Sequence, residues 1–327
     1  MKMQRVMLAV LAVCGTSAAM AQSSVTIYGR VNTTIEQQKL GDNKVTGMYN
    51  NASRIGFKGV EDLGGGLKAG FVLEAGFDSD DGSGPGGAGI NFGRQSEVNL
   101  SGNWGMVRLG NFTPESYYAT ADYISLHNHD TGSSADVLYY DPVLYGSLGQ
   151  GNKIAYRTPE FGGFWAEAAV SMHERNAVSS TGNTRYGYDL AANYSAGALA
   201  LGAGYSQVDD DRQAAIRALY TMGPVTLGAY YQRNDQELAG TRNNYRISAM
   251  YAVGASEFHA NVGRANSWSK VSDTGATQWT LGYNYNLSKR TKLYGYFTKV
   301  HSKDNAEYVG APGENFRSIA LGVRHNF

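Results

Sequence analysis

Short alternating segments run through this chain of 327 residues and constrain its fold more than any other feature. In "SVTIYGRVNTTIE", residues 24–36, apolar or small side chains occupy the odd positions and mostly polar ones the even positions. A repeat of two places these sets on opposite faces of a β-strand. The pattern recurs in "GLKAGFVLEAGFD", "ALALGAGYSQ" and "PVTLGAYYQR", so the sequence predicts an all-β protein.

The number and spacing of these segments indicate a barrel. Tight connections such as "EDLGGG" alternate with longer polar ones such as residues 301–313, which is typical of an up-and-down outer-membrane barrel. Spanning strands need about 9–11 residues, so sixteen fit this length. The sequence therefore predicts a 16-stranded antiparallel transmembrane β-barrel. Its strands start near residues 23, 43, 66, 89, 105, 151, 163, 183, 197, 212, 224, 243, 256, 273, 290 and 314.

A soluble β-sandwich is the alternative fold, because its strands alternate in the same way. Two features favour the membrane barrel. Small residues such as Gly202, Gly204 and Gly228 are mixed with arginines on the polar face, and tyrosines gather near strand ends on the apolar face. Aromatic residues at those positions match the girdles of membrane barrels.

The first residues read as an export signal. Lys2 and Arg5 precede an apolar run from Val6 to Val13, and small residues follow up to Ala21. This three-part pattern predicts a secretory signal peptide over residues 1–21 and a barrel over 22–327. The run is far shorter than the roughly 20 residues of a membrane-spanning helix.

Removal of this segment has consequences for chemistry. Cys14 is the only cysteine, so residues 22–327 can form neither a disulfide nor a thiolate metal site. Without Lys2 and Arg5, 26 basic residues remain against 28 acidic ones. No net basic charge favours nucleic acid as a partner.

The segment "SIALGVRHNF", residues 318–327, also alternates. Ile319, Leu321, Val323 and Phe327 share one face. In a closed barrel the final strand pairs with the first, so we expect this segment to be a fully paired strand.

Several segments in this order resemble the trimeric general-diffusion porins of Gram-negative outer membranes, in their beta-proteobacterial branch. They are "SSVTIYGRVN", "SRIGFKGVEDLGGGLKAGFVLEAGF", "FGRQSEVNLSGNWGMVRLGNFTP", "YRTPEFGGFWAEAAVS", "LSKRTKLYGYF" and "ALGVRHNF". The resemblance implies a homotrimer of barrels, each with a water-filled pore for ions and small hydrophilic solutes, narrowed by an inward-folded third extracellular loop. It implies contact with outer-membrane lipid and lipopolysaccharide, and a barrel-assembly machinery that reads Phe327.

The longest connection, residues 113–150, is the candidate for that loop. A connection of this length is uncommon unless it has a function. It follows the fifth predicted strand, as in the family, and contains no Lys or Arg. Its acidic residues are Glu115, Asp122, Asp130, Asp136 and Asp141.

Basic residues have the polar parity of their strands and form the other half of the predicted constriction. Acids on the loop opposite bases on the wall predict a transverse field, and charged rings set ion preference. Because bases outnumber acids on the predicted lumen face, we expect an anion preference. The constriction candidates are Arg30, Arg54, Lys58, Lys153 and Arg157, and Arg185, Arg217, Arg246 and Arg324 add to the lumen charge.

Two positions depart from the family pattern. "GNF" places Asn111 where the family often has an arginine. Arg94 in "FGRQ" resembles a constriction arginine and is retained as a candidate, yet it shares the parity of Val98 and Leu100. Strict alternation therefore turns Arg94 away from the lumen, unless a bulge restores it.

Other motifs favour no catalytic or cofactor site. "HNHD", residues 127–130, lacks a convincing third metal ligand, and "EDLGGG" lacks the Lys-Ser/Thr of a phosphate loop. An outer-membrane hydrolase would need a Ser/His or Asp/His pair at one rim, and none is identifiable from spacing. A sugar-selective channel would need an aromatic stripe along the lumen, whereas Tyr28, Tyr230 and Trp165 are scattered. We therefore expect no cofactor or bound metal, and both alternatives remain open.

Overall fold

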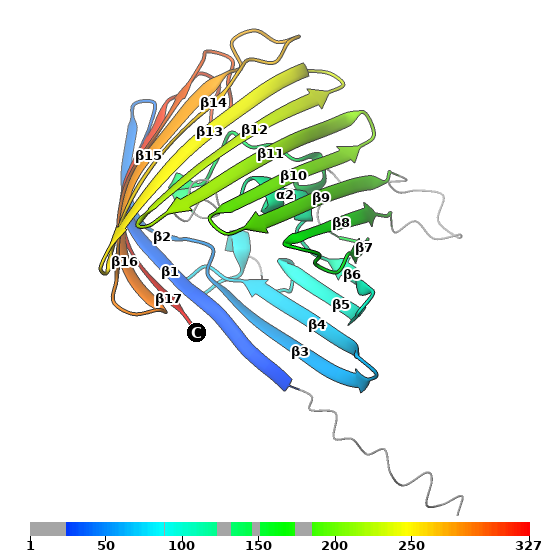
Figure 1. Cartoon of the computed structure of the whole chain (residues 1–327). Helices are drawn as coiled ribbons and strands as arrows, with labels where there is room; N and C mark the ends of the chain where they lie inside the picture. The colour runs from blue at the N-terminus through cyan, green and yellow to red at the C-terminus, as the bar shows by residue number, and fades with distance from the viewer. Residues whose placement is uncertain (1–23, 88, 123–131, 146–150, 174–184) are drawn as a thin grey trace, which may run out of the picture.

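The computed structural model describes residues 24–87, 89–122, 132–145, 151–173 and 185–327. These residues form a closed antiparallel barrel, which confirms the predicted fold class (Figure 1). The predicted signal peptide, residues 1–21, lies outside them. The strands are β1 (Ser24–Leu40), β2 (Asn43–Asn50), β3 (Arg54–Gly64), β4 (Leu67–Gly76), β5 (Gln95–Gly102), β6 (Gly105–Asn111), β7 (Lys153–Arg157), β8 (Phe164–Ser171), β9 (Gly187–Ala196), β10 (Leu199–Val208), β11 (Asp211–Met222), β12 (Val225–Gln236), β13 (Gly240–Val253), β14 (Ser256–Ala265), β15 (Ala276–Asn286), β16 (Thr291–Ser302) and β17 (Phe316–Asn326). The short helices are η1 (Pro85–Gly87), α2 (Glu115–Thr120), η2 (Gly132–Ser134) and α3 (Pro142–Tyr145).

The described strands are seventeen, yet they fill sixteen positions around the barrel. β2 pairs with the second half of β1, and β3 pairs with its first half, both on the same side. Between them, Ala52 adopts a left-handed φ of 55° and inserts a bulge, which interrupts a single barrel strand. The amide of Asn32 reaches across this break and donates to the Ser53 hydroxyl at 2.9 Å.

The first and last strands close the sheet. β1 pairs with β17 from Arg30 opposite Asn326 to Leu40 opposite Phe316. Beyond the ladder, the Gly29 and Phe327 amides donate to each other's carbonyls at 3.0 and 3.1 Å. A closed sheet has no free edge, so backbone polar groups in the membrane bond within the sheet.

The two faces of the wall differ in polarity as predicted. On β17, Ile319 and Leu321 are 54% and 70% exposed, whereas Ser318 and Ala320 are at most 1% exposed. The same alternation on β1 leaves Ile35 58% exposed. Apolar side chains therefore face outward and polar or small ones inward, which is the arrangement of a barrel in lipid.

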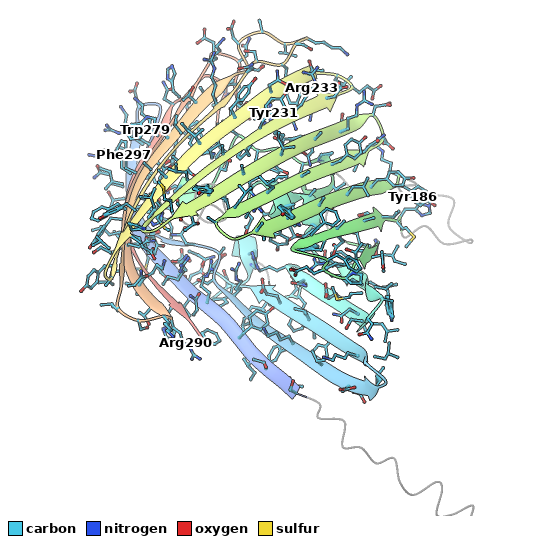
Figure 2. All side chains as sticks on the ribbon, viewed as in Figure 1. Tyr186, Tyr231, Arg233, Trp279, Arg290 and Phe297 are labelled. Atoms are coloured by element: carbon cyan, nitrogen blue, oxygen red, sulfur yellow. The ribbon has the colours of Figure 1, made fainter. Side chains whose placement is uncertain are left out.

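Outward aromatic side chains lie near both ends of the strands. Figure 2 shows Trp279 and Phe297 together on the outside of the wall, with ring centroids 5.0 Å apart. Such girdles mark the two membrane interfaces. Among the described residues, no helix is both long and apolar enough to cross a membrane. Near the short-turn end the exposed aromatics are Tyr194, Tyr220, Tyr251, Phe258, Tyr283 and Tyr285.

Candidate functional site

In the long connection between β6 and β7, helix α2 lies inside the barrel against the inner faces of β9, β10 and β11. Two glycines of β10 make this close approach possible. A Cβ at Gly202 would collide with the Ala119 carbonyl, and one at Gly204 would lie 2.8 Å from the Ser116 Cβ. The small inward residues of "ALALGAGYSQ" are therefore the seat of the loop helix.

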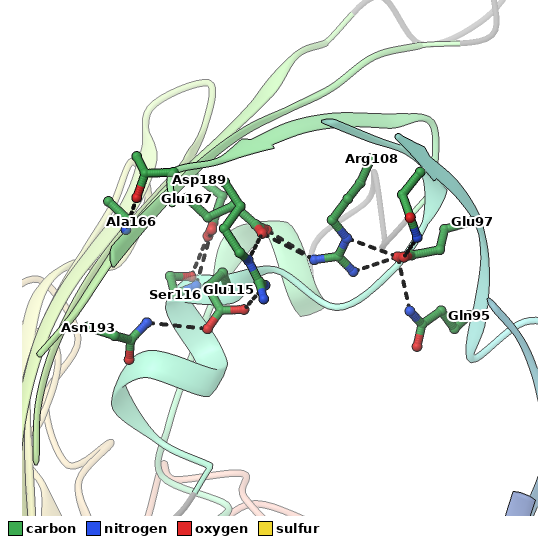
Figure 3. Close-up of polar contacts among 12 residues, drawn as sticks. Gln95, Glu97, Arg108, Glu115, Ser116, Ala166, Glu167, Asp189 and Asn193 are labelled. Carbon is green, nitrogen blue, oxygen red and sulfur yellow. Dashed lines mark hydrogen bonds and ion pairs between the residues drawn. The ribbon is translucent and has the colours of Figure 1, made fainter. Parts of the chain in front are cut away.

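Glu115, the first residue of α2, joins the loop to a chain of charges on the wall (Figure 3). Its carboxylate lies 2.8 Å from Nη2 of Arg157, whose Nε donates to Glu167 at 2.8 Å. Glu167 also pairs with Arg108 at 3.2 Å, and Arg108 pairs with Glu97 at 2.6 Å. Three carboxylates and two guanidiniums thus alternate from α2 to strands β7, β8, β6 and β5.

Burial raises the pKa of Glu115 to about 7, although the Arg157 guanidinium opposes this shift. The side chain is nearly buried between α2 and the wall. A loop carboxyl that titrates near neutral pH can change the charge of the constriction within the physiological range.

A second polar cluster joins α2 to β9 and to the start of α3. The Ser116 amide donates to Asp189 of β9 at 3.1 Å, and the Ser116 hydroxyl lies within hydrogen-bond distance of both Asp189 and Asp141. Asp141 in turn accepts the Val143 amide at 2.9 Å at the start of α3. Lys153 is only 2% exposed, and its ammonium lies 5.1 Å from the centroid of the Phe112 ring. Lys153 and Asp141 therefore lie behind the loop and do not face an open lumen.

The returning half of the loop is bonded to the wall through Asp136. Its carboxylate accepts two bonds from Arg246 of β13, at 2.6 and 2.8 Å, and one from the Tyr230 hydroxyl at 2.7 Å. Burial raises the pKa of Asp136, but Arg246 and these hydrogen bonds outweigh it and hold the pKa below its usual value.

Side-chain amides on the inner wall bond the loop backbone in sequence. Gln278 of β15 accepts from the Val137 amide and donates to the Ala135 carbonyl. Gln232 of β12 does the same for Tyr140. Two more bonds join the loop to the wall. Asn244 of β13 donates to the Leu138 carbonyl, and the Ser133 hydroxyl donates to Glu36 of β1.

Four basic residues lie side by side on the inner faces of β16, β17, β1 and β3. Lys292 is opposite Arg324, and Arg30 is opposite Arg54. Arg324 is also opposite Asn32, which is two residues from Arg30 on the same face of β1. We call Lys292, Arg324, Arg30 and Arg54 the inner row. All four remain partly exposed.

A carboxylate lies at each end of the inner row. Glu257 is 3.4 Å from Lys292 at one end, and Glu74 is 3.9 Å from Arg54 at the other. Arg94 pairs with Glu74 at 2.7 Å and therefore joins this wall. The prediction that strict alternation turns Arg94 away from the lumen was wrong. Arg94 precedes β5, which begins at Gln95, so the alternation of that strand does not fix the direction of its side chain.

The predicted acids do not form a free face opposite the bases. Glu115 and Asp136 are each paired with an arginine of the wall they touch, and Asp122 is buried. Asp130 and the rest of "HNHD" lie outside the described residues. Lys58 is exposed on β3, with its ammonium 5.2 Å from the centroid of the Tyr28 ring.

Several residues of the charge network were missed from sequence. Arg108 alternates with Val107 and Leu109 on β6, so its inward direction was readable from parity. Its partners Glu97 and Glu167 come from other strands, and no spacing along the chain could have paired them.

Comparisons with known proteins agree with this architecture. Residues 8–305 match the Gram-negative porin family. The chain is 34% identical to outer membrane porin protein 32 of Delftia acidovorans, over 100% of both chains, and 28% identical to an outer membrane porin protein of Bordetella pertussis, over 99% and 100%. The structure is similar to an anion-selective porin from Comamonas acidovorans, with 31% identity, a TM-score of 0.78 and coverage of 94% and 100%. It shares its fold with the trimer form of OmpT from Vibrio cholerae, at 17% identity, a TM-score of 0.69 and coverage of 93% and 99%. The chain therefore belongs to the Gram-negative porin family and is a channel protein of the outer membrane, not an enzyme.

Proposed function

We propose that the pore conducts ions and small hydrophilic solutes by passive diffusion and prefers anions. The inner row carries this proposal, because it places two facing pairs of cations, offset from each other by two residues, on adjacent strands of the lumen wall. Charged groups that line a pore set its ion preference. The loop carboxylates of Glu115 and Asp136 form ion pairs with Arg157 and Arg246. They therefore cancel little of the positive charge of the inner row. The similar structure from Comamonas acidovorans is described as anion-selective, which supports the same preference here.

In this proposal the constriction is formed by the inner wall and the loop together. Arg30, Arg54, Arg94 and Arg157 contribute positive charge, and Lys58 adds to it nearer the short-turn end. Glu115 is the loop acid that adjusts the field. Barrels of 16–18 strands are wide enough to enclose an aqueous channel.

We also propose the partners and processing of the chain. Residues 1–21 are removed on export, three copies assemble, and the barrel-assembly machinery recognises the segment that ends at Phe327. The outer surface contacts lipid and lipopolysaccharide. The trimer form of a structure with the same fold supports the assembly state, and no cofactor enters the proposal.

A potassium chloride gradient across a planar bilayer tests the ion preference. We expect a reversal potential of the sign for chloride, and closure of the channel in three voltage-driven steps. A reversal potential of the opposite sign would show cation preference and contradict the proposal.

Liposome swelling separates general diffusion from a sugar-selective channel. The inward tyrosines Tyr230, Tyr294 and Tyr296 are at most 5% exposed, so they form no open aromatic stripe among the described residues. We therefore expect swelling rates that fall smoothly with sugar size. One sugar entering far faster than others of its size would favour the selective channel.

A further inference from the structure

Four basic side chains form a second row, on the outer surface. Backbone pairing sets Lys299 of β16 opposite Arg317 of β17, and Arg317 opposite Lys39 of β1. Lys39 is in turn opposite Lys44 of β2. Side chains that are directly opposite share a face, with Cβ atoms about 5 Å apart. We call Lys299, Arg317, Lys39 and Lys44 the outer row.

The outer row faces the membrane side of the wall and lies at the long-loop end. Ile319, two residues from Arg317, has the same parity and is 54% exposed. Ile35, four residues from Lys39, is 58% exposed. At about 3.3 Å per residue, the row is therefore roughly 7–13 Å beyond the apolar belt. Lys299 and Arg317 lie next to residues 303–315, the long connection between β16 and β17. The outer row is therefore at the end of the barrel that carries the long loops.

The row is poorly compensated by the protein itself. Within the described residues, the only carboxylate at ion-pair distance from any of the four is Asp42, 3.6 Å from Lys39. Like charges directly opposite each other destabilise a sheet, and the row contains three such pairs in succession. An arrangement that costs stability in the isolated chain indicates an external anion that bridges these strands.

Its surroundings indicate where that anion comes from. Trp279 is directly opposite Lys299, and its ring contacts Phe297 on the outside of the wall (Figure 2). Tryptophan is enriched at the level of lipid headgroups. The strongest anions at that level are phosphates, which the guanidinium of Arg317 can bind through two parallel hydrogen bonds.

We propose that the outer row binds the phosphate groups of lipopolysaccharide, with the acyl chains lying along the apolar belt below Arg317. This inference names the site for one partner of the proposed function and rests on the outer-membrane location of the barrel. The bound phosphates neutralise the row and fasten β16, β17, β1 and β2 to the lipid, across the seam where the barrel closes.

Lipid titration of the delipidated protein tests the site. The row variant carries Lys39→Gln, Lys44→Gln, Lys299→Gln and Arg317→Gln. The matched control carries Arg185→Gln, Arg212→Gln, Lys270→Gln and Lys303→Gln, four exposed cations with other partners at the same end. Native mass spectrometry counts bound lipopolysaccharide, intact or stripped of its phosphates.

We expect the row variant to bind intact lipopolysaccharide at least tenfold more weakly than the wild type and the control. The stripped lipid should bind all three proteins equally weakly. Equal binding of the intact lipid by the row variant and the control would overturn the proposal. Inorganic phosphate that saturated the row as readily as the lipid would overturn the assignment to a lipid.

A charge-preserving variant guards against a folding defect. Lys39→Arg, Lys44→Arg, Lys299→Arg and Arg317→Lys should together retain lipid binding within about threefold, because the row keeps its charge; a tenfold loss would contradict a charge-based site. Conductance and ion preference should be unchanged in the row variant and in the charge-preserving variant, since the row lies outside the pore. Failure of lipid binding is thus distinguishable from failure of the channel.

Discussion

At the residue scale, the buried charge chain predicts which arginine matters most for stability. Arg108 is 9% exposed at its side chain and lies between Glu97 and Glu167, which are 4% and 0% exposed. Removing one partner of a buried pair leaves an uncompensated charge and costs about 3–5 kcal/mol. We expect Arg108→Met to lower the free energy of unfolding, measured by urea titration in lipid vesicles, by about 3 kcal/mol. Arg212→Met, at an exposed pair with Asp235, should leave the free energy of unfolding close to that of the wild type, because solvent screens an exposed ion pair. Equal effects would argue against a buried network.

A second residue-scale prediction concerns pH. Because burial raises the pKa of Glu115 to about 7, this carboxyl gains a proton as the pH falls from 8 to 6. The loop then loses a negative charge, so Arg157 adds more positive charge to the pore. The permeability ratio of chloride to potassium should therefore rise as the pH falls through 7, measured by reversal potentials at both pH values. Glu115→Gln should remove most of this dependence, and an unchanged pH slope in that variant would exclude Glu115 as its source.

At the scale of elements, the seat of α2 on β10 predicts the effect of a bulky side chain there. Gly202→Val would push its side chain into the Ala119 carbonyl and displace the helix from the wall. Overpacking of this kind costs about 1–3 kcal/mol. We expect a lower and more variable single-channel conductance in planar bilayers. Gly89→Val, where no atom lies within 4 Å of the added Cβ, is the control. Wild-type conductance in Gly202→Val would mean that α2 does not rest on β10.

Strand positions were largely predictable because period-two alternation is a local property. The predicted starts near residues 105, 197 and 256 lie within two residues of β6, β10 and β14. The break between β2 and β3 was not predictable, because it depends on the left-handed backbone of Ala52. The helices α2 and α3 were also missed, since contacts with the wall hold these short segments.

The inward direction of individual residues was predictable, but their partners were not. Parity alone turned Arg324 and Arg246 inward, and the structure agrees. Parity could not show that Arg246 binds the loop through Asp136, or that Lys153 is buried behind it. Those differences arise from where α2 and residues 132–145 lie inside the barrel, which no strand pattern encodes.

At the scale of the whole molecule, the closed wall separates two rows of basic side chains. The inner row faces the lumen on β16, β17, β1 and β3, and the outer row faces lipid on β16, β17, β1 and β2. Both cross the seam where β1 meets β17. Because alternate side chains point to opposite faces, the same strands can carry both rows without contact between them.

The most direct test of this account reverses the charge of the inner row. Wild-type protein and an Arg30→Glu, Arg54→Glu, Arg324→Glu variant are compared by reversal potential in the same potassium chloride gradient. The account predicts chloride preference in the wild type and potassium preference in the variant, with no change for Lys39→Glu on the outer face. An unaltered reversal potential in the inner-row variant would contradict the claim that this wall selects the ions.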